Sequence, residues 1–172
     1  MAVVNLIPII THALVFGVVL ASILFATILV VVRINPEIML RDYPPDVQAA
    51  HGPMSDRTKR QRLVVGILVL GVMFGVIVAS LPPALDDLEG TRLFPILFVH
   101  FLVMFSVFNV LDWLLLDWLI VVRLRPSFLI LPGTAGMPGY RDYAFHFRGF
   151  LIGVPITLAA SLLLAGLGAL LL

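Results

Sequence analysis

The chain has no cysteine and few charged residues. Only 12% of its 172 residues are charged, whereas 61% are hydrophobic. A soluble domain carries charge on about a quarter of its residues, so this composition does not suit a water-soluble fold. The missing cysteine also excludes disulfides, thiolate metal sites, iron–sulfur clusters and cysteine nucleophiles.

Catalytic and nucleotide-binding signatures are missing as well. The sequence contains neither His-Glu-x-x-His nor Gly-x-Ser-x-Gly, and its glycine- and proline-rich segment 132–139 matches no phosphate-binding loop or dinucleotide fingerprint. A net charge of +1 gives no reason to expect nucleic acid as a partner. We therefore expect no catalysis, although a lipid-acting enzyme without a recognisable nucleophile stays open.

Four long apolar stretches dominate the sequence. They cover about residues 3–33, 62–82, 93–122 and 149–172. Each reaches the roughly 20 residues that a helix needs to cross about 30 Å of hydrocarbon. The first stretch follows an uncharged N-terminal segment, so we expect a retained helix and not a secretory signal. The sequence predicts an all-α, polytopic membrane protein whose four transmembrane helices form a bundle and a single membrane domain over residues 1–172.

The basic residues lie almost entirely in two of the three connecting segments. The short segment 83–92 holds only Arg92, beside three acidic residues. Basic residues mark cytoplasmic loops because they resist translocation. We therefore predict two helical hairpins, with the loops 34–61 and 123–148 facing lipid headgroups in the cytoplasm and both termini outside. With their edges, these two loops hold ten of the 11 basic residues: Arg33, Arg41, Arg57, Lys59, Arg60, Arg62, Arg123, Arg125, Arg141 and Arg148.

The two hairpins share an order of features that is typical of a duplication. His12 precedes the tripeptide 41–43, Arg-Asp-Tyr, and His100 precedes the same tripeptide at 141–143. This would be a parallel repeat with its axis along the membrane normal. Chance recurrence explains the same observation, and Asp112 has no counterpart in the first hairpin.

His12 and His100 are candidates for binding a cofactor. Each lies about two turns inside its helix from the outer end, so their depths match. Two histidines on separate helices can ligate a b-type haem axially or share a metal, and Ala13, Gly17 and Ser106 are small enough to line a haem ring. In the plainer interpretation, each histidine bonds a neighbouring backbone group inside the bundle.

Polar residues of the third apolar stretch suggest ion or proton passage. Asn109 and Asp112 lie about 60° apart on a helix, and an aspartate among apolar residues can relay protons or bind cations. Trp113 and Trp118 place this region near the inner interface. Asp117 points elsewhere, and we expect it to pair with a nearby arginine.

Two Gly-x-x-x-Gly motifs indicate close helix packing. They are Gly71 with Gly75, and Gly149 with Gly153. Membrane helices associate through small residues because no water is expelled between them, and we expect these motifs to pack within the chain.

Together these patterns favour a non-catalytic subunit, scaffold or assembly factor of a membrane complex. Its partners would be the lipid bilayer and other membrane subunits or a second copy of the chain. Arginine outnumbers lysine ten to one, which is typical of GC-rich bacterial genomes, so the bacterial inner membrane is the expected location. The alternatives are electron transfer through haem b or a metal at His12 and His100, and passage of protons or cations at Asp112.

Overall fold

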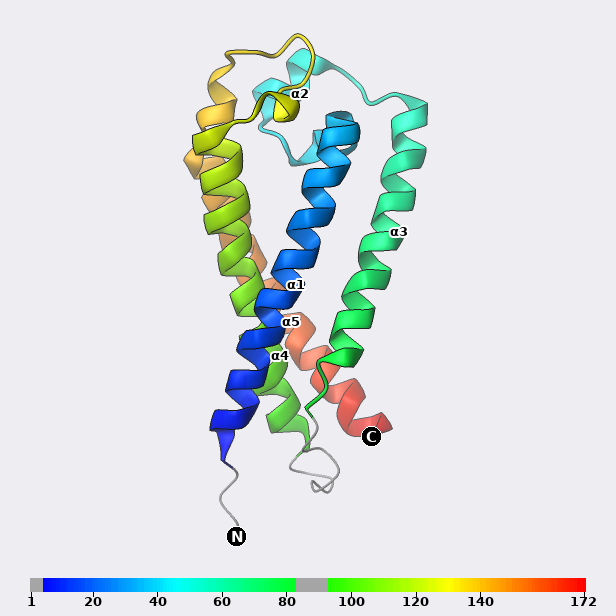
Figure 1. Ribbon diagram of the computed structural model, residues 1–172, viewed down its shortest axis with the longest axis vertical. Helices are drawn as coiled ribbons and strands as arrows, with labels where there is room; N and C mark the ends of the chain where they lie inside the picture. Colours follow the sequence, from blue (N-terminus) through cyan, green and yellow to red (C-terminus); the bar gives the residue numbers. More distant parts are fainter. Residues whose placement is uncertain (1–4, 83–92) are drawn as a thin grey trace. The chain divides into compact units, whose positions relative to one another are not determined.

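The computed structural model describes residues 5–82 and 93–172 (Figure 1). Within them the chain is helical, without a strand, and four helices are long and apolar enough to cross a membrane. The prediction of an all-α chain with four such helices is therefore confirmed. The expected acidic outer loop, 83–92, lies outside the described residues. The four helices are Leu6–Ile34, Asp56–Ala79, Leu93–Leu124 and Tyr143–Leu171.

Local sequence explains where the helices begin and end. Helix α1 (Leu6–Ile34) ends before Asn35, because Pro36 follows and disfavours a helical conformation at the residue before it. Helix α3 (Asp56–Ala79) begins before the expected residue 62. Ser55 caps it, since the Ser55 Oγ accepts a hydrogen bond of 3.2 Å from the backbone N–H of Thr58.

Helix α5 (Tyr143–Leu171) also begins earlier than the expected residue 149. The Asp142 side chain accepts a hydrogen bond of 2.9 Å from the backbone N–H of Phe145, which caps the first turn. The last residues of the loop predicted over 123–148 are therefore helical from Tyr143 onward. The described connecting residues, 35–55 and 125–142, contain four short helices: η1 (Pro36–Asp42), α2 (Pro45–His51), η5 (Ser127–Leu129) and η6 (Pro138–Arg141).

The third apolar stretch is not one α-helix. Helix α4 (Leu93–Leu111) continues as the π-helix η4 (Asp112–Leu124). At its end the backbone N–H of Arg125 donates 2.9 Å to the carbonyl of Ile120, which is the five-residue spacing of a π-helix. The predicted helix over residues 93–122 is present as one membrane-length span, Leu93–Leu124, but its second part has π-helical hydrogen bonding.

Backbone contacts divide the chain into two compact units. Unit 1 contains the residues up to Ala21 together with Met73–Leu111 and Phe150–Leu172, and unit 2 contains Ser22–Val72 and Asp112–Gly149. That the two units form a single membrane domain stays a prediction.

Unit 1 is held by close helix contacts at glycines. A Cβ atom on Gly17 of α1 would lie 2.7 Å from the Cβ of Val107 on α4, so only glycine fits there. Gly168 of α5 likewise faces the side chain of Leu97, where an added Cβ would lie 2.5 Å from a methyl carbon. Small residues thus let the helices of this unit approach closely, as membrane helices commonly do.

Candidate functional site

Unit 2 contains a packed structure built from both basic loops, which we call the loop platform (residues 35–54 and 126–142). Its core joins residues of the two loops across a long sequence separation. Their side chains are at most 6% exposed, so the loops enclose a small hydrophobic core of their own. The core residues are Leu40, Tyr43, Val47, Leu131 and Tyr140.

Two hydrogen bonds lock the loops together. The Tyr43 hydroxyl donates a bond of 2.7 Å to the carbonyl oxygen of Leu129. The backbone N–H of Gly139 donates a bond of 2.9 Å to the Asp46 carboxylate at the start of α2. A Cβ atom on Gly139 would overlap that carboxylate, so the close approach requires glycine. Burial raises the pKa of Tyr43, so its hydroxyl keeps the proton that it donates.

Tyr140 organises the glycine- and proline-rich segment. The backbone N–H of Leu131 donates 3.0 Å to the Tyr140 hydroxyl, which also lies 2.6 Å from the hydroxyl of Thr134. The rings of Tyr43 and Tyr140 meet edge to face at 5.9 Å. Backbone N–H groups in and beside this segment therefore donate hydrogen bonds within the platform, as expected for a connecting loop.

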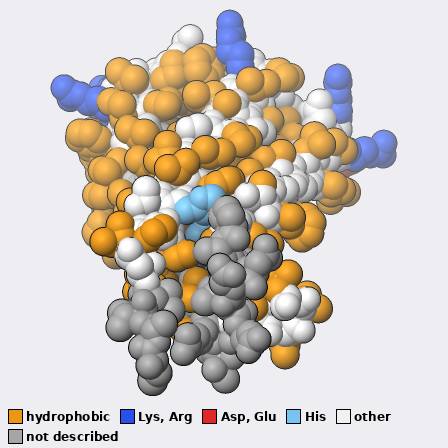
Figure 2. Space-filling view, turned by 60° about the horizontal axis from the view of Figure 1, so that its bottom comes forward, with side chains coloured by type: hydrophobic (Ala, Val, Ile, Leu, Met, Phe, Trp, Pro, Cys, Tyr) orange, Lys and Arg blue, Asp and Glu red, His pale blue; other side chains and the backbone are white. Residues whose placement is uncertain are grey.

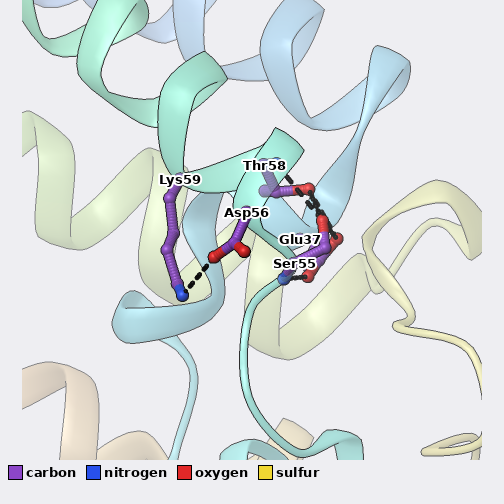
Figure 3. A network of polar contacts seen from close by, with 5 residues as sticks. All are labelled: Glu37, Ser55, Asp56, Thr58 and Lys59. Atoms are coloured by element: carbon purple, nitrogen blue, oxygen red, sulfur yellow. Dashed lines mark hydrogen bonds and ion pairs between the residues drawn. The ribbon is translucent and has the colours of Figure 1, made fainter.

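Glu37 anchors the platform to the start of α3 (Figure 3). Its carboxylate accepts bonds of 2.6 Å from the Ser55 backbone N–H and 2.6 Å from the Thr58 hydroxyl. The Thr58 bond lowers the pKa of Glu37 below its ordinary value of 4.5, against the opposing effect of burial. Asn35 adds bonds of 3.2 Å to the Thr58 hydroxyl and 2.9 Å to the Gln61 side chain. These contacts tie the end of α1 to the first turns of α3.

The predicted basic residues occupy several environments in unit 2. Arg62 donates 2.7 Å to the carbonyl of Ile38 and 3.3 Å to Asp42. Arg33 lies over the ring of Phe128 at 5.7 Å. Lys59 makes an ion pair of 2.7 Å with Asp56, and Arg148 makes one of 4.0 Å with Asp142. The backbone of Arg125 has a positive φ of 46°. The exposed remainder are Arg41, Arg57, Arg60, Arg123 and Arg141.

Asp117 pairs with a histidine and not with the expected arginine. Its carboxylate lies 2.9 Å from Nδ1 of His146 on α5, and the His146 side chain is only 7% exposed. The sequence predicts a loop over residues 123–148, so it gives no reason to expect His146 on a helix beside Asp117. Asp112, the candidate for ion or proton passage, lies partly buried in the same π-helix.

In unit 1, His12 and His100 come together as their matched depths suggested. Their ring centroids are 5.7 Å apart, and both Nε2 atoms reach Ser80: His12 its carbonyl oxygen at 3.1 Å, His100 its hydroxyl at 3.2 Å. The Ser80 hydroxyl gives its own proton to the Ile77 carbonyl at 2.8 Å, so it accepts from His100. On the face in Figure 2, histidine (pale blue) is visible among hydrophobic side chains.

The three small residues expected to line a haem ring do not share one environment. Ala13 is fully buried, Gly17 packs against Val107, and Ser106 is exposed. Across residues 5–82 and 93–172, no group of three or more histidine, aspartate or glutamate side chains is arranged to hold a metal. Haem or metal binding at His12 and His100 stays a prediction without a further ligand to support it.

The remaining predicted residues are Asn109 and the four glycines of the Gly-x-x-x-Gly motifs. The Asn109 amide donates 3.2 Å to the carbonyl of Phe150 and lies against Gly153, within unit 1. A Cβ atom on Gly71, Gly75 or Gly149 would meet no atom of another described element within 4 Å. Of the four motif glycines, only Gly153 therefore has the packing contact expected within the chain.

No family model, curated protein or solved structure matches this chain. Its function must therefore be argued from its own residues. In the described part of the chain, the loop platform joins polar side chains of both basic loops, and the sequence does not predict its residues Glu37, Tyr43 and Tyr140 as a functional site. The two Arg-Asp-Tyr tripeptides differ there, since Tyr43 is 6% exposed and Tyr143 is 44% exposed. The duplication stays a prediction.

Proposed function

We propose that the protein is a non-catalytic subunit or scaffold of a complex in the bacterial inner membrane. It acts through the loop platform, which presents a preformed surface to a protein partner at the cytoplasmic side. The observation that carries this proposal is the locking of the two loops by Tyr43 and Asp46. Loops that served only to connect helices would not need a buried core and long-range hydrogen bonds, because short solvated turns suffice.

The topology of the proposal follows from charge. Both basic loops belong to the platform, so they lie on one side of the membrane, and their arginines favour the cytoplasm. The chain then forms two hairpins with both termini outside. Arg141 on the platform is exposed, and so is Arg60 on the first turns of α3, which Glu37 ties to the platform; both are available for an acidic partner surface.

Site-specific photo-crosslinking in living cells tests the proposal. A photoreactive amino acid placed at Arg60 or Arg141 is expected to capture one defined membrane protein or a second copy of the chain. The same substitution at Leu68, an α3 residue that is 60% exposed in an apolar stretch, is the matched control and should capture lipid only. Asp46→Ala should abolish the protein adduct at both arginine positions. Adducts that are absent at both positions, or unaffected by Asp46→Ala, would contradict the proposal.

A further inference from the structure

Unit 2 contains a cavity of about 790 Å³ between the platform and the first half of α3. Three cationic side chains line it: Arg41, Lys59 and Arg62. No acidic residue is among its lining residues. Two of the cations have acidic partners outside the lining, since Lys59 pairs with Asp56 and Arg62 with Asp42. The polar end of the cavity is therefore suited to an anion.

The three cations differ in how far their hydrogen-bond donors are already used within the protein. Arg62 uses Nη1 for its bonds to Ile38 and Asp42, which leaves its other guanidinium donors for a ligand. The Lys59–Asp56 pair is exposed, with side-chain exposures of 60% and 87%, so it stabilises little and is easily exchanged. Arg41 makes no ion pair or side-chain hydrogen bond within the described chain and is exposed.

The other wall of the cavity is apolar. It is formed by Leu63, Gly66, Ile67 and Leu70 on successive turns of α3. Leu63, Ile67 and Leu70 are 66%, 61% and 67% exposed, and a Cβ atom on Gly66 would meet nothing within 4 Å. This wall belongs to a helix that is apolar enough to cross a membrane. A hydrocarbon chain can therefore lie in the groove over Gly66 and continue into the bilayer.

We propose that this cavity binds one phospholipid with a net negative headgroup. The phosphate contacts Arg41, Lys59 and Arg62, and one acyl chain lies along the Gly66 groove. Charge complementarity favours an anion, since basic pockets beside membrane helices bind anionic headgroups. The adjoining apolar wall favours a lipid over free phosphate, because a soluble anion gains nothing from that surface. This site is independent of the protein partner proposed above.

Native mass spectrometry of the delipidated full chain tests this assignment. Phosphatidylglycerol and phosphatidylcholine with identical acyl chains are titrated separately. We expect one bound phosphatidylglycerol, held about tenfold more tightly than phosphatidylcholine, the change that a charge-assisted hydrogen bond commonly gives. Arg41→Gln should remove that preference. Arg57→Gln changes the net charge equally, but Arg57 lies outside the cavity, so this variant should retain the preference.

A second pair of variants tests the apolar wall without changing charge. Gly66→Leu fills the groove and should weaken phosphatidylglycerol binding by about tenfold. Gly71→Leu places the same side chain on the same helix outside the cavity and should bind as the original chain does. Helix content from circular dichroism confirms that each variant is folded.

Three results would overturn the assignment. Equal retention of the two lipids would remove the selectivity, and equal losses in Arg41→Gln and Arg57→Gln would show a diffuse charge effect. Displacement of the lipid by millimolar glycerol 3-phosphate would show a site for phosphate alone.

Discussion

The Tyr43 hydroxyl donates a hydrogen bond of 2.7 Å to the carbonyl oxygen of Leu129, a residue 86 positions further along the chain. The two residues belong to different basic loops, and both are buried. This bond, with the contact of Asp46 and Gly139, makes one folded platform out of two connecting segments.

Tyr43→Phe is expected to destabilise the protein by about 1–3 kcal/mol, because the buried Leu129 carbonyl loses its partner. Thermal unfolding in detergent, followed by circular dichroism, measures the effect. Tyr143→Phe is the matched control, since Tyr143 is 44% exposed, and it should unfold at the original temperature. Equal melting temperatures for the two variants would show that the Tyr43 bond contributes nothing.

Gly139→Ala should loosen the platform, because the added methyl overlaps the Asp46 carboxylate and forces the two loops apart. Limited proteolysis of the loops should become faster. Gly149→Ala adds the same methyl to a helical glycine with open surroundings, and it should leave proteolysis unchanged. Slow cleavage of both variants would mean that the loops do not depend on this contact.

Acidification should weaken the anchor at Glu37. Its pKa in the folded protein lies below the ordinary value of 4.5, chiefly because Thr58 donates to the carboxylate. The ionised side chain therefore contributes its full stabilisation above that value and loses it as the pH falls through the lowered pKa. Glu37→Gln should lower the melting temperature at pH 7 and should differ less from the original chain at pH 3. A difference that stays constant with pH would contradict this role.

Ser80→Ala should destabilise unit 1 by about 1–2 kcal/mol, since the Nε2 of buried His100 loses its acceptor. Ser106→Ala removes an exposed hydroxyl from α4 and serves as the control. Thermal unfolding measures both. If Ser80→Ala melts as the control does, the serine does not hold the histidine pair.

Sequence reasoning succeeded where the information is local. Apolar stretches of sufficient length indicate membrane helices, and the proline after Asn35 indicates the end of the first. Ser55 and Asp142 are local signals as well, because serine and aspartate are common N-cap residues and each directly precedes a helix.

The rest depends on residues that are distant in sequence. No sequence pattern near Tyr43 indicates that Leu129 is its hydrogen-bond partner, and none near Asp117 indicates that His146 is its ion-pair partner. The hydrophobic pattern likewise does not distinguish the π-helix of residues 112–124 from an α-helix, because its residues are as apolar as those of an α-helix. Such features are set by tertiary packing, which overrides local preference.

The central claim is that both basic loops form one platform on the cytoplasmic side. Because the chain has no cysteine, single cysteines introduced at Arg60 and Arg141 can be labelled without background. A membrane-impermeant maleimide is applied to intact cells and to opened cells. Our account predicts that both positions react only after the cells are opened; labelling of either position in intact cells would contradict it.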